Sequence, residues 1–232
     1  MVDIDRLTEY ELCRMFDHTL LKPYASKQDF LKLCEEAKTN HFAMVAINSY
    51  PVSLCKEALK GTDVHVGAAI SFPLGQMSIR SKCEETQNAI DDGADEIDYV
   101  VNVSKVKDGD FRYVKEEMTS LVELAHRNHV LIKVIFENCY LTKEEIVKLS
   151  QIAKEVRPDY IKTSTGFGTS GATVEDVKIM KSIVGDDVKV KAAGGIRDWE
   201  TCRKMLLAGA ERIGTSSSLK ILEGFRSEKN SV

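Results

Sequence analysis

Residues 159–218 read DYIKTSTGFGTSGATVEDVKIMKSIVGDDVKVKAAGGIRDWETCRKMLLAGAERIGTSSS, and this stretch decides the fold. It holds three short runs rich in β-branched residues, each followed by glycine or serine, with a helical pattern between one run and the next. Strands that alternate with helices are typical of a parallel sheet with crossover helices. Outward from here, the same alternation predicts eight strands at 18–21, 42–48, 64–70, 95–102, 130–136, 159–164, 188–195 and 210–216.

Helical patterns fill the segments between the expected strands. A short helix is expected near the N-terminus, and the longer helices are expected at 27–40, 79–93, 110–128, 142–156, 173–184 and 198–209. Thr142 and Glu145 form a capping-box pattern, which marks the start of a helix. Gly93 and Gly209 lie where a left-handed residue would end a helix.

One closed barrel accounts for this organisation. Eight strands in 232 residues leave about 29 residues for each unit, close to the ~30 residues of a βα repeat. We therefore predict an α/β fold, a (β/α)8 TIM barrel that forms a single domain over residues 1–232. A doubly wound open sheet is the alternative, but it usually carries a glycine turn after its first strand. Here the glycine-rich turns come late in the chain.

Composition and charge exclude several classes of protein. The 32 basic and 36 acidic residues give a net charge of −4 and a pI near 5.8. We expect no nucleic-acid partner, because such binding needs a basic stripe. No run approaches the roughly 20 apolar residues that span a bilayer, so we expect no membrane partner. Charges interrupt the N-terminal segment, so we expect no signal peptide and a cytoplasmic location. The six scattered cysteines are expected to be reduced thiols.

Charged residues interrupt four of the expected strands, although parallel strands normally read as apolar runs. They lie on consecutive strands and are Asp98, Lys133, Lys162 and Lys191. Burying an unpaired charge is costly, and neighbouring strands lie about 5 Å apart. If the four side chains point into the barrel, three ammonium groups and one carboxylate converge in one pocket. Lys189 shares the face of Lys191 but is expected at the lower end of the barrel.

Such a cluster suits imine-forming chemistry on a carbonyl compound. A lysine nucleophile must be unprotonated, and its ordinary pKa is about 10.4. Burial and neighbouring cations depress that pKa, which is how Schiff-base lysines are prepared. A carboxylate beside them can accept and return protons, directly or through water.

Glycine-rich turns follow the last three expected strands. They are KTSTGFGTSG (162–171), AGGIRD (193–198) and IGTSSS (213–218). Glycine lets a ligand approach the backbone, and N–H groups at helix starts bind anions. In barrels the loops after strands seven and eight are the usual phosphate site. Three such turns at one face favour a phosphorylated small-molecule ligand.

Together these segments resemble the deoxyribose-phosphate aldolase family of class I aldolases. The matching segments span nearly the whole chain and are DHTLLKP (17–23), GADEIDYVVN (93–102), LIKVIFE (131–137), DYIKTSTGFGTSGAT (159–173), VKAAGGIRD (190–198) and RIGTSS (212–217). The resemblance implies reversible cleavage of 2-deoxy-D-ribose 5-phosphate to D-glyceraldehyde 3-phosphate and acetaldehyde through a lysine Schiff base, in deoxynucleoside catabolism. It implies no metal and no cofactor, and it implies a homo-oligomer, a dimer or tetramer.

The resemblance also implies roles for single residues. Lys162 would form the Schiff base, Lys191 would lower its pKa and share in proton transfer, and Asp98 would act as acid and base through water. Three more residues would orient the substrate or support the network, namely Lys133, Asp17 and Thr19. The residues that match phosphate-binding turns are Gly166, Gly194, Gly195, Gly214, Ser216 and Ser217.

Some residues depart from the family pattern, and two other functions stay open. Ala46 stands where many members have cysteine, which bears on the tolerance of aldehydes, and Ser170 replaces a glycine, which bears on phosphate affinity. A metal-dependent aldolase would need clustered histidines, but among the five only His126 and His129 are close in sequence. The alternatives are another Schiff-base aldolase with a different phosphosugar and a barrel that binds a phosphorylated ligand without turnover.

Overall fold

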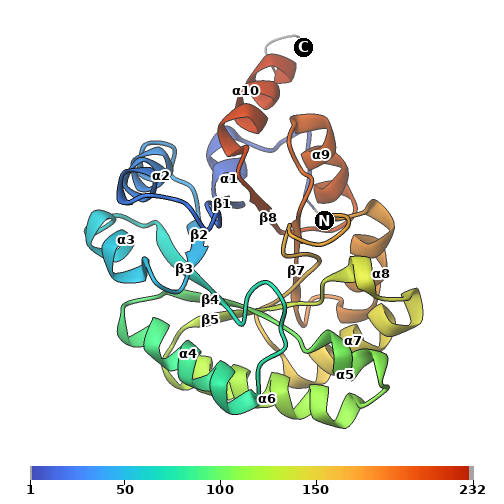
Figure 1. The fold of residues 1–232 in the computed structure, drawn as a ribbon. Coiled ribbons are helices and arrows are strands. Elements are labelled where there is room, and N and C mark those ends of the chain that lie inside the picture. Colours follow the sequence, from blue (N-terminus) through green and yellow to red (C-terminus); the bar gives the residue numbers. More distant parts are fainter. Residues whose placement is uncertain (1, 230–232) are drawn as a thin grey trace.

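Eight parallel strands close into a barrel in the computed structural model, which describes residues 2–229 (Figure 1). The strands are β1 (Phe16–Thr19), β2 (Met44–Asn48), β3 (His65–Ile70), β4 (Glu96–Val100), β5 (Leu131–Ile135), β6 (Tyr160–Lys162), β7 (Lys189–Ala193) and β8 (Arg212–Thr215). Each strand pairs with the next one in the chain, and β8 closes the ring by pairing with β1. The predicted (β/α)8 barrel is confirmed. Residues 1 and 230–232 of the expected domain lie outside the described residues.

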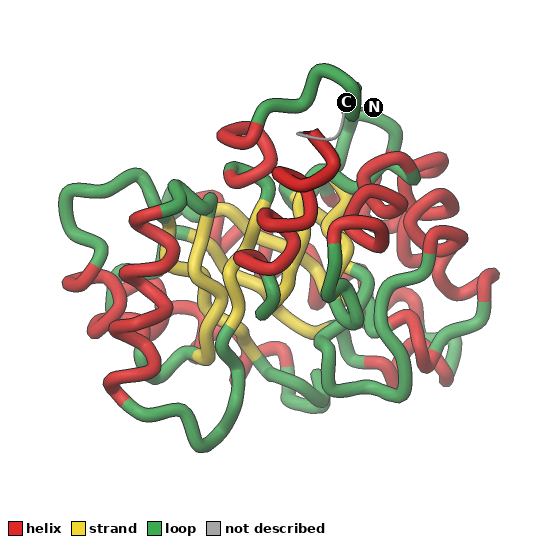
Figure 2. Tube along the Cα trace, turned by 90° about the horizontal axis from the view of Figure 1, so that it is seen from above, coloured by secondary structure: helices red, strands yellow, loops and turns green. Residues whose placement is uncertain are grey.

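Helices surround the ring of strands (Figure 2). They are α1 (Glu9–Cys13), α2 (Lys27–Thr39), α3 (Val52–Ala58), α4 (Ile79–Asp91), α5 (Val103–Lys107), α6 (Phe111–Arg127), α7 (Lys143–Val156), α8 (Val174–Val184), α9 (Trp199–Leu207) and α10 (Ser218–Lys229), with a 3-10 turn η1 (Asn138–Tyr140). The expected helices are present, with ends that differ by at most two residues. The pattern does not predict α3 and α5, because helices of 7 and 5 residues are too short to show a period. No described helix is long and apolar enough to cross a membrane.

Local signals explain several element boundaries. The Thr142 hydroxyl accepts the Glu145 N–H at 3.3 Å, and the Glu145 carboxylate accepts the Thr142 N–H at 2.7 Å, which is the predicted capping box. Gly93 and Gly209 have φ values of 100° and 109°, as predicted for residues that end helices. β1 begins before the predicted strand, because Asp17 is buried inside it and its charge hides the strand from a search for apolar runs.

The two faces of the sheet bury different kinds of side chain. Strand residues that face the helices, such as Ile97 and Val134, belong to the main apolar core. A second, much smaller apolar cluster lies inside the barrel and consists of Ala43, Met44 and Ala46. Gly67 leaves room for it, since a Cβ there would lie 2.2 Å from the Met44 sulfur. The barrel interior is therefore largely available to charged groups.

A buried ion pair outside the barrel anchors the end of β4. Lys82 of α4 and Glu117 of α6 are fully buried, with Nζ 2.7 Å from Oε1. Lys82 also donates to the Val100 carbonyl at 2.7 Å, and Glu117 accepts the Asn102 N–H at 3.0 Å. The pair therefore fixes the backbone just beyond Asp98.

Lys82→Met should lower the free energy of unfolding by about 3–5 kcal/mol, because it leaves the Glu117 carboxylate buried without its partner. Urea unfolding followed by circular dichroism measures this loss. Arg80→Met on the same helix is the matched control, since the Arg80–Glu84 pair is exposed and such pairs contribute about 0–1 kcal/mol. Equal losses in the two variants would contradict the anchoring role of the buried pair.

Candidate active site

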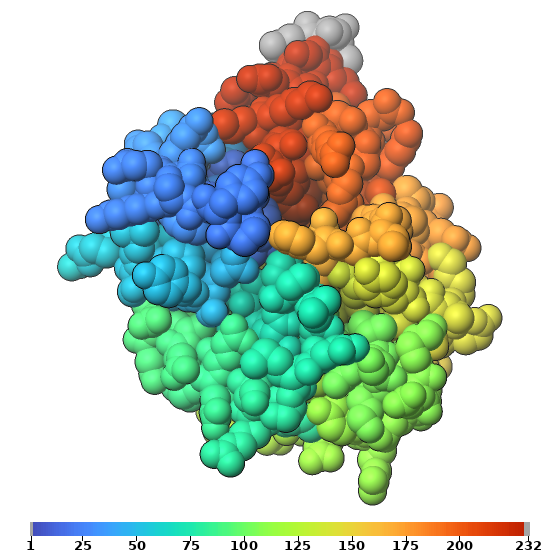
Figure 3. All heavy atoms as spheres, viewed as in Figure 1, coloured from blue at the N-terminus to red at the C-terminus, as the bar shows by residue number. Residues whose placement is uncertain are grey.

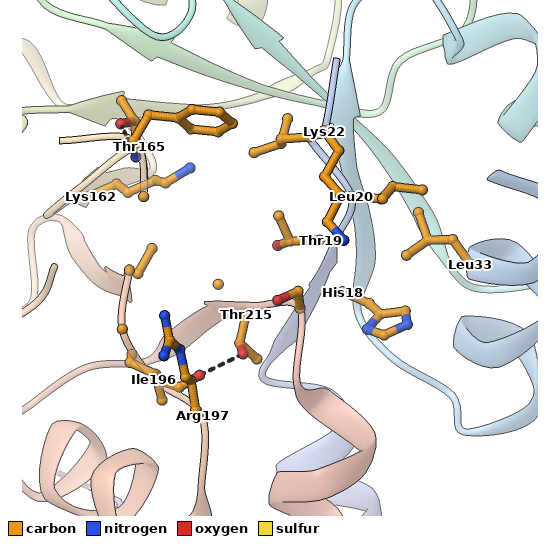
Figure 4. A pocket seen from close by; sticks show the side chains of 18 of the residues that line it. His18, Thr19, Leu20, Lys22, Leu33, Lys162, Thr165, Ile196, Arg197 and Thr215 are labelled. Atoms are coloured by element: carbon orange, nitrogen blue, oxygen red, sulfur yellow. Dashed lines mark hydrogen bonds between the residues drawn. The ribbon is translucent and has the colours of Figure 1, made fainter. Parts of the chain in front are cut away.

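A cavity of about 490 Å³ lies at the carboxyl ends of the barrel strands. Its walls come from the ends of β1, β6, β7 and β8, from the residues that follow them and from α2. Figure 4 shows Lys162 and Thr165 on one side of the cavity and Thr19, Leu20 and Lys22 on the opposite side. In barrel enzymes this end of the sheet carries the active site.

Beneath the cavity, one carboxylate binds three ammonium groups. The Nζ of Lys133 lies 2.9 Å from Asp98 Oδ1. The Nζ atoms of Lys162 and Lys191 lie 2.9 and 2.6 Å from Oδ2 of the same carboxylate. The sheet register pairs Asp98 with Lys133 across β4 and β5, and Lys162 with Lys191 across β6 and β7. The four charged strand residues thus converge as predicted, and Lys189 is exposed at the first position of β7, also as predicted.

Three further buried charges complete this network. Asp17 of β1 contacts the Nζ of Lys191. Glu96 of β4 contacts the Nζ of Lys133. Arg212 of β8 lies 2.6 Å from Asp17 and 3.4 Å from Glu96. The predicted set of three ammonium groups and one carboxylate is therefore present but incomplete, because the barrel adds two carboxylates, which are counter-ions to the lysines, and one guanidinium, which binds those carboxylates.

Glu96 and Arg212 are absent from the sequence prediction, although the sequence signals both. Glu96 lies two residues before Asp98 and so shares its face of the strand. Arg212 interrupts the last strand in the same way as the lysines interrupt the strands before it. A charge inside a buried strand identifies both residues as candidates, whereas their partners follow only from the closed barrel.

The pKa of Lys162 is lowered and that of Lys133 is raised. Burial lowers the pKa of Lys162 most, Asp98 raises it and Lys191 lowers it, which leaves a pKa of about 8. Lys133 is equally buried, but Asp98 and Glu96 outweigh the burial and hold its pKa above the usual range. Burial also opposes the charge on Asp98, yet the lysines hold the pKa of this carboxyl well below its ordinary value. Asp98 is therefore ionised at neutral pH.

Charge counting agrees with the lowered pKa of Lys162. When all are ionised, four positive and three negative charges are buried in the network, namely Lys133, Lys162, Lys191, Arg212, Asp17, Glu96 and Asp98. Lys133 and Lys191 each contact at least two carboxylates. Within the described chain Lys162 pairs with a single carboxylate, and it shares that oxygen with Lys191. Loss of a proton from Lys162 leaves the network neutral.

The cavity wall includes some of the predicted site residues and excludes others. Those in the wall are Lys162, Thr19, Gly166, Gly194, Gly195, Gly214 and Ser216. Those buried outside the wall are Asp17, Asp98, Lys133 and Lys191. Ser217 also lies outside the wall, and its N–H donates to the Thr215 hydroxyl at 2.9 Å. Ala46 belongs to the inner apolar cluster and does not line the cavity.

Close backbone packing joins the three glycine-rich turns into one wall. A Cβ on Gly171 would lie 2.1 Å from the Gly194 carbonyl oxygen, so the turn after β6 packs directly on the turn after β7. The Thr215 hydroxyl donates to the Ile196 carbonyl at 2.7 Å, which ties the turn after β8 to the same segment. Gly194 and Gly195 have φ values of 85° and 77°, a conformation that favours glycine.

Several residues of the wall are missing from the sequence prediction. From the turns and from the end of β1 they include Thr165, Phe167, Ile196, Arg197, Thr215, His18, Leu20, Leu21 and Lys22. All nine lie inside segments already singled out by their glycines or by the DHTLLKP motif. The α2 residues, such as Leu33 and Glu36, carry no such signal, because their place depends on how the helix packs on the barrel.

The chain matches known proteins over most of its length. Residues 12–224 match the family model described as DeoC/LacD family aldolase. The chain belongs to this family. It is 58% identical over 216 residues to a deoxyribose-phosphate aldolase of Lactobacillus acidophilus, across 93% of this chain and 91% of that protein. It is 50% identical to a deoxyribose-phosphate aldolase of Thermococcus gammatolerans, across 93% of this chain and 97% of that protein.

One solved structure with the same fold is also similar to this chain. The deoxyribose phosphate aldolase from Aeropyrum pernix, whose structure is described as a unique tetramer, superimposes with a TM-score of 0.89 at 31% identity. The match covers 97% of this chain and 95% of the Aeropyrum chain. The resemblance to deoxyribose-phosphate aldolases that the motifs indicate is confirmed, and the chain is an aldolase, a carbon–carbon lyase.

The pKa of about 8 on Lys162 sets a testable pH dependence for this aldolase. The neutral amine is the reactive form, so acetylation of Lys162 by a pulse of acetic anhydride should rise about tenfold per pH unit below about pH 8 and level off above it. Lys191→Met removes a charge that lowers this pKa and should move the profile to higher pH. Peptide mass spectrometry measures the labelling.

The control for this experiment is Lys189→Met. Lys189 lies exposed at the far end of β7 from the cavity, so its loss should leave the Lys162 profile where it is in the unaltered protein. A Lys191→Met profile that coincides with the control profile would contradict the electrostatic role of Lys191.

Proposed function

We propose that the chain catalyses the reversible cleavage of 2-deoxy-D-ribose 5-phosphate to D-glyceraldehyde 3-phosphate and acetaldehyde through a Schiff base on Lys162. The proposal depends mainly on the position and the pKa of one lysine. Of the three network lysines, Lys162 is the one in the cavity wall, and its pKa is about 8. The names of the relatives, deoxyribose-phosphate aldolases, support the choice of substrate.

Formation of the imine uses the neutral form of Lys162. Its Nζ attacks C1 of the open-chain aldehyde, and a proton moves from nitrogen to oxygen to form a carbinolamine. A second proton then allows the hydroxyl to leave as water, which produces a protonated imine. We assign Lys191 as the partner in this proton transfer, because its Nζ lies 2.6 Å from the Asp98 oxygen that Lys162 also contacts.

Cleavage of the C2–C3 bond follows from the electron demand of the protonated imine. A base removes the proton from the C3 hydroxyl, the C3 oxygen becomes a carbonyl, and the electron pair of the broken bond moves to the imine to form an enamine. We assign Asp98 as the group that accepts this proton, through a water molecule. Its carboxylate is ionised, and the water is included because Asp98 lies buried outside the cavity wall. Glyceraldehyde 3-phosphate then leaves.

Release of the second product reverses the first steps. C2 of the enamine takes up a proton, water adds to C1 of the resulting imine, and the carbinolamine collapses to acetaldehyde and free Lys162. Every step in this scheme moves protons between side chains, water and substrate, so the proposed reaction uses neither metal nor redox cofactor.

The glycine-rich wall supplies the proposed phosphate site. The residues that line it are Gly166, Gly194, Gly195, Gly214 and Ser216, and glycines allow the phosphate to approach the backbone. Arg197 and Lys22 line the same cavity and add positive charge near it. Thr19, at the end of β1, also lines the cavity and is proposed to contact the sugar, whereas Lys133 and Asp17 are proposed to hold the network from below.

We also propose that residues 1–232 act as one domain, in the cytoplasm, in the breakdown of deoxynucleosides. The phosphorylated substrate and the six free cysteines support this setting. No described helix could cross a membrane, and the net charge of −4 does not favour binding to nucleic acid.

Treatment with sodium borohydride in the presence of substrate should attach the substrate fragment to Lys162, because hydride reduces the imine to a stable amine. Peptide mass mapping locates the adduct. Lys162→Leu should form no adduct and lose turnover by several orders of magnitude. Lys189→Leu, at the other end of the barrel, should keep both. An adduct elsewhere, or turnover in Lys162→Leu, would refute the proposal.

We further propose a homo-oligomer, a dimer or tetramer, on the strength of the tetrameric Aeropyrum pernix relative. Sedimentation equilibrium at micromolar concentration should give two or four times the 25.9 kDa mass of the chain. A species with the mass of the single chain over that concentration range would be contrary to this proposal.

A further inference from the structure

His18 lies where the two ends of the barrel sheet meet. It is the third residue of β1, and the sheet register pairs it with Thr215 of β8. Figure 3 shows the N-terminal part of the chain, in blue, against the C-terminal part, in red. The side chain is buried, and the residue lines the edge of the cavity (Figure 4). No step of the proposed reaction uses this side chain.

Both ring nitrogens of His18 have a partner, and each partner belongs to a different helix. Nε2 lies 2.8 Å from a carboxylate oxygen of Glu36, on α2. Nδ1 lies 3.0 Å from the hydroxyl oxygen of Ser218, the first residue of α10. The ring also contacts that of Phe42, with centroids 5.1 Å apart. His18 therefore joins the end of β1 to two helices at the mouth of the barrel.

The partners fix the direction of these two hydrogen bonds. A carboxylate accepts hydrogen bonds, so Nε2 carries the hydrogen that bonds Glu36. Burial lowers the pKa of His18, and Glu36 opposes this effect only in part, so the neutral ring is favoured. A neutral ring has one N–H, so Nδ1 accepts the hydrogen of the Ser218 hydroxyl. Because both nitrogens are engaged, neither exchanges a proton with the substrate.

Ser218 is the last residue of the glycine-rich turn 213–218. Its hydroxyl lies 3.4 Å from the Thr215 carbonyl oxygen, farther than from His18. At the start of the turn, the Thr215 hydroxyl accepts the Ser217 N–H at 2.9 Å. Ser216, which lines the cavity, lies between these anchors. The bond from His18 therefore fixes one end of the short segment that carries Ser216.

We propose that His18 is a positioning residue for the substrate phosphate, acting through Ser218 on the turn that contains Ser216. This proposal rests on the phosphate site proposed above. The hydrogen bond holds the start of α10, so the N–H groups of the turn keep the positions in which they bind an anion. Glu36 contributes by fixing the tautomer in which Nδ1 accepts.

Steady-state cleavage of 2-deoxy-D-ribose 5-phosphate and of 2-deoxy-D-ribose measures this role. His18→Phe keeps a ring beside Phe42 and removes both hydrogen bonds. It should raise KM for the phosphorylated sugar about tenfold, the factor expected for loss of one hydrogen bond that orients a binding group. kcat should change little, because binding is lost equally in the ground state and the transition state. kcat/KM for the unphosphorylated sugar should stay the same.

Ser218→Ala removes the other partner of the same hydrogen bond and should raise KM for the phosphorylated sugar by a similar factor. It keeps the test open if His18→Phe does not fold. Because both changes act through one bond, the double variant should be no worse than either single variant. Equal KM changes for the two sugars, or effects that multiply in the double variant, would overturn the positioning role.

His126→Phe is the matched control. His126, on α6, also bonds a carboxylate, with Nε2 3.0 Å from Asp159, but it does not line the cavity. Its replacement should leave KM and kcat for both sugars unchanged. A rise in KM equal to that of His18→Phe would count against a specific role for His18.

The unaltered protein separates this proposal from the one before it. If it cleaves 2-deoxy-D-ribose as efficiently as the 5-phosphate, the proposed phosphate site fails, and the role of His18 fails with it. If it prefers the 5-phosphate and the folded His18 and Ser218 variants keep that preference in full, the positioning role alone is refuted.

Discussion

The contact of Asp98 with three lysines is the interaction on which the rest of the site depends. Ammonium groups buried side by side repel one another, and each has lost its water. Asp98 offers one oxygen to Lys133 and the other to Lys162 and Lys191, so all three can stay inside the barrel. Two more carboxylates and Arg212 below them bring the network close to neutrality. The remaining imbalance is one positive charge, and it favours loss of a proton from Lys162.

The fold places the Lys162 amine at one end of the barrel, beside the cavity. Parallel strands present their carboxyl ends at one rim, so the lysines and the glycine-rich turns meet there. Tight backbone contacts, such as Gly171 on Gly194 and Gly75 on Val101, leave the rim little freedom. The glycine-rich turns that line the cavity suit a phosphate. The outer face contributes rigidity, because Lys82 and Glu117 clamp the backbone that follows Asp98.

Much of this architecture could be predicted from the sequence, because strand and helix periodicity are local properties. The eight strands, the capping box at Thr142 and the glycine ends of helices follow from residues a few positions apart. Exceptions have a physical cause. The start of β1 is displaced by a buried charge, and α3 and α5 are too short to show a period. The four charged strand residues stand out because a buried parallel strand should contain none.

The sequence by itself determined that the charged residues on four strands, Asp98, Lys133, Lys162 and Lys191, are buried together, because a Lys or Asp inside an apolar strand must find a partner when the barrel closes. Only the tertiary structure decided which partners these are, since the register of neighbouring strands sets them and no local pattern records it. The places of Glu96 and Arg212, the single carboxylate contact of Lys162 and the bond of His18 to Ser218 all depend on that closure. Contacts between residues far apart in the chain form only when β8 returns to β1.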